Sequence, residues 1–206
     1  MDHGMSTARV DSASIPPESG AAIIAAFQAQ YEFDQISEHA TFRAQLPEGL
    51  HGASLPHDVI LLLAEGAPID GLQEIDYEDG RAHWETPLLT ALIEGRYAAA
   101  QALIEAGADP DAPCFIGTVG HWFAHTALHK VIGQRGAIAV QILIDAGADV
   151  NRETTVGSTP LHIAAIDDNS EIARILMEAG ADASILNSNG TRARDVAGPQ
   201  TAPIFA

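Results

Sequence analysis

A length of 206 residues allows one domain with a sizeable core, and 28 acidic against 10 basic residues give a net charge of −18. A field of that sign repels duplex nucleic acid and anionic membranes, which excludes both as partners, and it attracts a basic protein. The sequence has one cysteine, Cys114, no apolar run long enough to span a membrane and no secretory signal, so we expect a cytoplasmic protein without a disulfide.

The first third of the chain gives three expectations. Residues 1–19 are polar and contain a Pro-Pro pair, which predicts a disordered tail. Residues 21–31 place isoleucine, phenylalanine and tyrosine at helical spacing, which predicts an extra helix at the N-terminal end of the domain. Residues 59–67 predict a further helix that ends at Gly66. We therefore assign residues 20–57 to N-terminal capping helices or a diverged first unit.

The sequence then repeats itself. Each unit opens with a threonine and closes with Gly-Ala-Asp, and the threonine lies 21 residues before the glycine in all three units. The units open at Thr86, Thr126 and Thr159 and close at Gly107, Gly147 and Gly180. A fixed spacing of this kind predicts stacked units that share one elongated core.

The third unit shows why each one folds as a pair of helices. Thr159 is a good N-cap, and Pro160 suits the first helical turn, where its missing N–H is not needed. Leu161 and Ala164 fall on one helical face, and Gly180 ends the second helix as a left-handed C-cap residue. Each unit has an apolar face that it cannot bury alone, so the units must stack.

The units resemble ankyrin repeats. Residues 159–165 read TPLHIAA and residues 143–151 read LIDAGADVN, and both match the family pattern. The resemblance implies an all-α solenoid of stacked helix-turn-helix units with hairpin finger loops. It covers residues 58–197, with about three full repeats between N- and C-terminal capping units, and leaves 198–206 as a tail. Residues 189–197 are expected to form the last, capping helix.

Two loops are longer than this family pattern requires. Thr126 and Thr159 lie 33 residues apart, the usual repeat length, whereas Thr86 and Thr126 lie 40 apart. Because the helical part is constant, the extra residues fall in loops 70–85 and 111–125. In the family such loops form fingers beside a concave groove, which is where a partner usually binds.

These two loops hold most of the candidate partner-binding residues. Tryptophan is over-represented among residues that dominate binding energy, and both tryptophans of the chain lie here. Alternatively, the two tryptophans pack against each other and order the loops. The histidines are expected to make binding sensitive to pH near their ordinary pKa. The candidates are the aromatic residues Trp84, Trp122, Phe115 and Phe123, the acidic residues Asp76, Glu78 and Asp79, and the histidines His83 and His125.

A second set of candidates comes from the expected concave groove. Positions seven to nine after each opening threonine vary between units while the core positions do not, as expected of a presented surface. The candidates in this set are Glu94, Gln134, Arg135 and Asp167.

The sequence favours neither catalysis nor a bound metal or other cofactor. No phosphate-binding loop or nucleophile motif is present, and Cys114 is a lone thiol in a loop. His121, His125 and His129 are spaced by four, but the helix is expected to start only at Thr126. His129 occupies a family position at which the imidazole usually bonds the neighbouring loop.

We therefore predict a protein-binding module that is monomeric when unbound. One specific version is an inhibitor or immunity-type protein that covers the active site of a basic partner such as a nuclease, because acidic residues can mimic phosphates. Nine arginines against one lysine, with abundant alanine, favour a bacterial source. Two alternatives stay open, a small-ligand sensor with a pocket between the two long loops and a self-associating structural module.

Overall fold

The computed structural model of the chain describes residues 49–76, 81–118, 121–133 and 136–206. The tail expected over 1–19 and the helix expected over 21–31 lie outside these ranges. Within them, no helix is long and apolar enough to cross a membrane. The helices of the described part are α3 (Pro56–Ala64), α4 (Pro87–Ile93), α5 (Tyr97–Glu105), α6 (Ala127–Ile132), α7 (Ala137–Asp145), α8 (Pro160–Ile166) and α9 (Ser170–Glu178).

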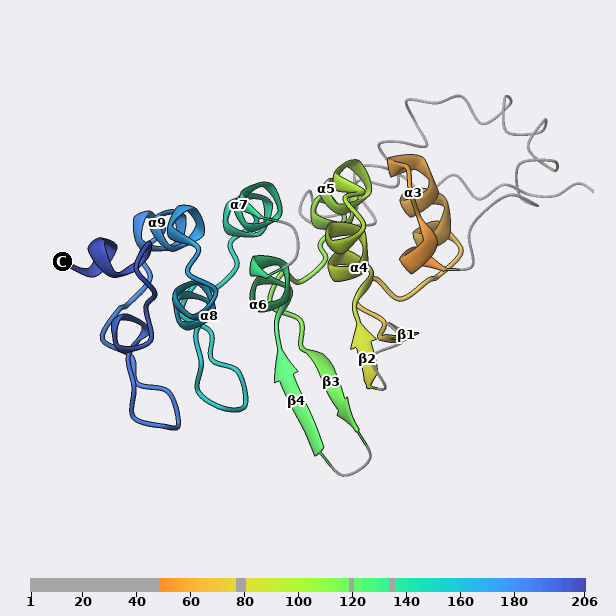
Figure 1. Cartoon of the computed structure of the whole chain (residues 1–206). Coiled ribbons are helices and arrows are strands. Elements are labelled where there is room, and N and C mark those ends of the chain that lie inside the picture. Colours follow the sequence, from red (N-terminus) through yellow and green to blue (C-terminus); the bar gives the residue numbers. More distant parts are fainter. Residues whose placement is uncertain (1–48, 77–80, 119–120, 134–135) are drawn as a thin grey trace, which may run out of the picture.

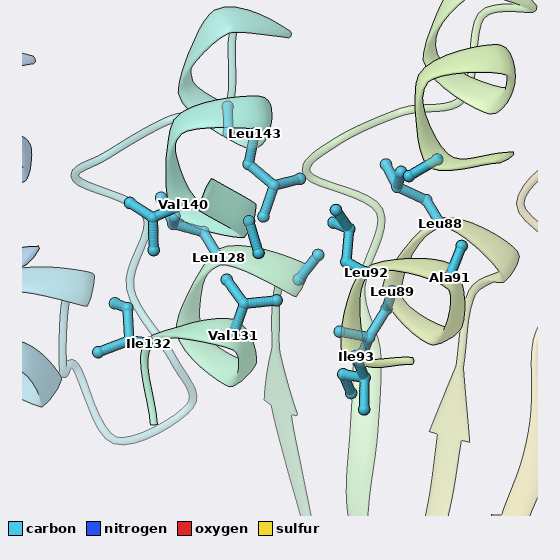
Figure 2. Packing of buried hydrophobic residues seen from close by; sticks show 14 of the residues in the cluster. Leu88, Leu89, Ala91, Leu92, Ile93, Leu128, Val131, Ile132, Val140 and Leu143 are labelled. Atoms are coloured by element: carbon cyan, nitrogen blue, oxygen red, sulfur yellow. The ribbon is translucent and has the colours of Figure 1, made fainter. Parts of the chain in front are cut away.

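The helices stack in two layers, as expected of a repeat solenoid (Figure 1). Helices α4, α6 and α8 lie side by side in one layer, and α5, α7 and α9 lie in the other, with α3 packed against α5. Figure 2 shows apolar side chains from neighbouring units filling the space between them, among them the buried Leu92, Leu128 and Leu143. A single large-to-small change here, such as Leu128→Ala, removes contacts to two units and typically costs about 2–5 kcal/mol.

The helices begin and end at the residues that the sequence indicates. The Oγ1 atom of Thr86 accepts a hydrogen bond from the Leu89 amide at 3.3 Å, and Pro87 occupies the first helical turn. Gly107 has a φ of 96°, which an L side chain rarely adopts, and the Ala108 amide donates to the Leu103 carbonyl at 2.9 Å. The predicted N-caps and glycine C-caps are therefore confirmed.

A histidine joins each of the later units to the next loop. In His129, Nδ1 accepts from the Thr126 amide at 3.2 Å and Nε2 donates to the Ser158 carbonyl at 3.2 Å. His162 repeats this arrangement, with its Nε2 atom 3.0 Å from the Thr191 carbonyl. Because one nitrogen accepts and the other donates, His129 is held as a neutral imidazole. The expectation that this imidazole bonds the neighbouring loop is confirmed.

The two long loops form an antiparallel sheet, which corrects the prediction of an all-α solenoid. We call this four-stranded sheet the finger sheet, and its strands pair in the order β1-β2-β3-β4 (Figure 1). The first loop supplies β1 and β2 and the second supplies β3 and β4, so two separate fingers join edge to edge through β2 and β3. The strands are β1 (Gln73–Asp76), β2 (Ala82–Glu85), β3 (Cys114–Thr118) and β4 (His121–His125).

The C-terminal end also differs from its prediction. The capping helix expected over residues 189–197 is reduced to one 3-10 turn, Ala193–Asp195, and a second 3-10 turn spans Ala202–Phe205. The Asp168 carboxylate accepts hydrogen bonds from the amides of Gln200 and Thr201, both at 2.9 Å. The predicted tail 198–206 is therefore held against the end of α8 and covers the last unit.

Candidate functional site

The strand register divides the finger sheet into two faces. Residues directly opposite each other on paired strands share a face, and successive residues of one strand alternate between faces. The inner face contains Gln73, Ile75, His83, Glu85, Cys114, Ile116, Phe123 and His125. The outer face contains Glu74, Ala82, Trp84, Phe115, Gly117 and Ala124. Of the sequence-predicted aromatic residues, Phe123 thus lies on the inner face, and Trp84 and Phe115 lie on the outer face.

A buried polar cluster holds the base of the inner face against α6. The Nζ atom of Lys130 lies 3.0 Å from Nδ1 of His83 and 3.9 Å from Oε1 of Glu85. His83 is 3% exposed and Glu85 is 1% exposed. Because His83 is covered, it positions the finger sheet on α6, and we take it out of the set of residues that would contact a partner.

His125 lies beside this cluster and does not titrate in the expected range. Burial lowers its pKa from 6.5 to about 4, assisted by the nearby positive charge of Lys130. Its Nδ1 atom lies 3.2 Å from the carbonyl oxygen of Thr126. The prediction that His125 makes binding sensitive to pH near its ordinary pKa is therefore wrong, because the imidazole is already neutral well below that pH.

Cys114 is buried under the same face. Burial raises the pKa of its thiol to about 11, and its Sγ atom lies 3.9 Å from Oγ1 of Thr86. A thiolate is the reactive form, so this side chain packs as a small apolar residue. In the described part of the chain no group of three or more histidine, cysteine, aspartate or glutamate residues is arranged to hold a metal ion.

Large apolar side chains are exposed around the inner face. Phe123 on β4 is 49% exposed, Val156 in the next finger is 44% exposed, and Ile166 at the end of α8 is 57% exposed. The Thr155 amide donates to the Ala124 carbonyl at 3.2 Å, which places the finger of Val156 next to β4. Scattered exposed apolar residues are ordinary, but these three belong to elements that follow one another in the stack.

Acidic residues follow two of the inner helices, and the one after α4 is paired with a cation, since Nη2 of Arg96 lies 2.8 Å from Oε2 of Glu94. Glu94 follows α4 and Asp167 follows α8, and both are exposed. The Oδ2 atom of Asp167 lies 3.3 Å from where a Cβ atom on Gly133 would sit, so the ends of α6 and α8 adjoin. We call Phe123, Val156, Ile166, Glu94 and Asp167 the inner patch. Gln134 and Arg135, predicted for the same region, lie outside the described residues.

Trp84 lies on the outer face, whereas the side chain of Trp122 lies outside the described part of the structure. Trp84 pairs in register with Phe115, and both side chains are half-buried. Trp122 pairs with Gly117, so the two tryptophans lie on strands separated by β3 and are not register partners. Glu78 and Asp79 lie outside the described residues.

The pairing of β2 with β3 also bears on the predicted ligand pocket. Neighbouring strands lie about 4.8 Å apart, so hydrogen-bonded strands leave no space between them for a small molecule. The described strands of the two long loops therefore do not enclose the pocket that the sensor hypothesis places between them. The sequence signal for this sheet is the presence of aromatic residues in AHWE and HWFAH, which favour strands and which our loop assignment did not use.

Comparisons with known proteins agree with the observed architecture. The family model for ankyrin repeats (three copies) matches residues 116–187. The human protein phosphatase 1 regulatory subunit 27 is 37% identical over 73 residues, which are 35% of this chain and 47% of that protein. The human ankyrin repeat and SOCS box protein 16 is 34% identical over 99 residues, 48% of this chain and 20% of that protein. The chain thus spans less than half the length of these relatives.

Proposed function

Because this chain is an ankyrin repeat protein, we propose that it is a non-catalytic module that binds a protein partner through the inner patch. The observation that supports this best is the exposure of Phe123, Val156 and Ile166 on three adjoining elements. Aromatic and aliphatic side chains of this size are the usual anchors of protein interfaces. One similar protein is named as a regulatory subunit of protein phosphatase 1, and we extend that class of role, regulation by binding, to this chain.

We further propose that the partner is basic. The net charge of −18 and the exposed Asp167 in the inner patch favour association with a positively charged surface, whereas the charge of Glu94 is balanced by Arg96, 2.8 Å away. An inhibitor or immunity-type role, in which the acidic face covers the anion-binding site of the partner, is the version that uses this charge most directly. Self-association is the alternative, and it predicts a dimer that Phe123→Ala disrupts.

Quantitative affinity capture tests this function. The bait is the full chain, compared with a Phe123→Ala/Ile166→Ala variant and with Ile138→Ala as a matched control. Ile138 is 59% exposed but lies on α7, in the layer away from the fingers. We expect a basic protein to be retained by the wild type and by Ile138→Ala and to be lost by the double variant. Equal retention by all three baits would exclude the inner patch as the binding surface.

A further inference from the structure

We propose that a hollow at the C-terminal end of the solenoid binds a small amphipathic anion, in which an acidic group is joined to an apolar group. The hollow has a volume of about 580 Å³ and lies between α9 and residues 192–206, at the end of the stack (Figure 1). Sites that bind small organic molecules usually enclose about 300–1,000 Å³. None of the lining residues belongs to the inner patch, so this inference goes beyond the proposed function.

The apolar part of the hollow comes from two elements that pack together. Met177 belongs to α9, and Ile204 and Phe205 belong to the 3-10 turn Ala202–Phe205. All three side chains are half-buried and pack against the hydrophobic core. The hydrogen bonds to the Asp168 carboxylate hold the segment just before this turn. An apolar group that enters the hollow therefore contacts a surface that is already formed, and it removes that surface from water.

Two arginines supply the cationic part of the hollow. Arg192 and Arg194 line it at the 3-10 turn Ala193–Asp195, and each guanidinium group carries five N–H donors. The Asp195 carboxylate lies 4.0 Å from Nη1 of Arg192 and 3.8 Å from Nε of Arg194. Both distances are longer than a hydrogen bond. The donors of both guanidinium groups are therefore available to an acidic group that enters the hollow.

The carboxylates at the hollow already accept hydrogen bonds from the backbone. Asp182, which lines the hollow, accepts from the Ser184 amide at 2.8 Å, and Asp195 accepts from the Arg192 amide at 2.8 Å. Both acidic side chains are exposed, so water weakens their repulsion of an anion. Because the guanidinium donors are open and these acceptors are engaged, the hollow complements a group with acceptor oxygens, such as a carboxylate or a sulfonate. This ligand is opposite in charge to the protein partner proposed for the inner patch.

Nuclear magnetic resonance of the methionine methyl groups in the full chain provides the test. The sequence has three methionines, of which Met177 lines the hollow, and Met177→Leu assigns its signal. Because Ala206 also lines the hollow, the chain carries no added C-terminal residues. The probe is octanoate, and its control is octanol, which has the same carbon chain without the charge. We expect octanoate to shift the Met177 signal saturably, octanol to bind about tenfold more weakly or less, and added salt to weaken octanoate binding.

Charge-matched variants separate this site from the general field of an acidic protein. Arg192→Gln/Arg194→Gln removes both cations of the hollow, whereas Arg152→Gln/Arg174→Gln removes two exposed cations that do not line it. We expect the first pair of changes to weaken octanoate binding by about tenfold or more and the second pair by less than about twofold. Equal weakening by both pairs, equal binding of octanol and octanoate, or no saturable shift of the Met177 signal overturns the proposal.

A further variant keeps the test informative if loss of the arginines disturbs the C-terminal turns. Asp195→Asn removes the carboxylate that lies near both guanidinium groups, and it keeps an oxygen that can accept from the Arg192 amide. We expect this change to strengthen octanoate binding by about two- to threefold, because the added anion no longer competes with a fixed one. Local unfolding would weaken binding, so a gain supports the anion site, and unchanged or weaker binding contradicts it.

Discussion

The Nζ atom of Lys130 lies 3.0 Å from Nδ1 of His83, although the two residues are 47 positions apart in the chain. Lys130 belongs to α6 and His83 to β2, so this contact fixes the first finger to the helix of the following unit. Lys130 is the only lysine of the sequence, and its charge is directed into the fold toward Glu85, 3.9 Å away. The orientation of the finger sheet therefore depends on an ammonium group that lies largely out of solvent.

Removing this ammonium group is expected to destabilise the protein. Lys130→Met removes the cation that lies 3.9 Å from the buried carboxylate of Glu85, and we expect a loss of about 2 kcal/mol or more in the free energy of unfolding. Urea denaturation measures the loss, with the exposed Arg152→Met as the control. The double variant Lys130→Met/Glu85→Gln should recover part of this loss, because the buried carboxylate is then replaced by a neutral amide. If Lys130→Met and the wild type had the same denaturation midpoint, the cluster would contribute nothing to the stability of the fold.

Acid should destabilise the fold through His129. Burial lowers the pKa of His129 from 6.5 to about 4, so the unfolded chain binds the proton more readily. The neutral His129 therefore supports the full stability of the fold above pH 6.5. As pH falls from 6.5 toward about 4, the free energy of unfolding decreases, by at most about 1.4 kcal/mol per pH unit.

His129→Leu isolates this contribution, since Leu89 occupies the equivalent position in the preceding unit. At pH 7 the variant should be less stable, because the Ser158 carbonyl loses its donor. As pH falls from 7 to 4.5 its deficit relative to the wild type should shrink, because only the wild type carries this histidine. Parallel curves of unfolding free energy against pH would refute the assignment.

We expect the ionised carboxylate of Asp111 to lower the stability of the folded protein. Its carboxylate accepts from the Asp149 amide at 3.0 Å, but burial and the neighbouring carboxylates of Asp149 and Asp109 raise its pKa. A raised carboxyl pKa means that this group favours folding below pH 3.8 and that the benefit is lost as pH rises through the folded pKa. At the next junction Asn151 accepts the equivalent bond from Asp182 at 2.7 Å.

Asp111→Asn should therefore keep the bond and remove the repulsion. We expect a gain of a few tenths of a kcal/mol at pH 7, a modest value because the site is partly exposed. Thermal unfolding at pH 7 and pH 3.5 measures it, and the gain should vanish at the lower pH. A lower melting temperature at pH 7 would mean that the charge itself stabilises the junction.

The C-terminal segment should be released by a change at Asp168. This residue has a φ of 52°, the one positive value of a non-glycine residue in the described part, and its Oδ1 atom accepts three hydrogen bonds from Gln200 and Thr201. Asp168→Ala removes the acceptor, and we expect hydrogen exchange of residues 200–205 to rise by about tenfold or more. Asp168→Asn keeps one side-chain oxygen that can accept these hydrogen bonds, so it should raise hydrogen exchange less than Asp168→Ala does. Unaltered exchange in Asp168→Ala would show that the segment is held by its apolar contacts.

The sequence predicts the units well because their signals are local. Thr159 and Gly180 act within one helical turn of their own positions, so a single sequence is enough to place the helix ends. The expected concave positions Glu94 and Asp167 are exposed for the same reason, since they follow those helices at a fixed count.

The joining of the two fingers into one sheet and the fold of the chain end were missed because their signals are not local. Trp84 and Phe115 are 31 positions apart, and only the stacking of two units brings their strands together. The last helix is shortened to a turn in which the Asp195 carboxylate accepts from the Arg192 amide at 2.8 Å, with no further unit for it to pack against among the described residues. The burial of His83 likewise follows from Lys130 in another unit and could not be read from its loop.

Hydrogen exchange of the chain with and without its captured partner tests the central claim most directly. The claim is that the partner covers the inner patch, so the account predicts protection in β4, in the finger of residues 153–158 and at the end of α8. Exchange in α5, α7 and α9 should stay unchanged. Protection confined to that outer layer, with the inner patch exchanging as in the free chain, would contradict the account.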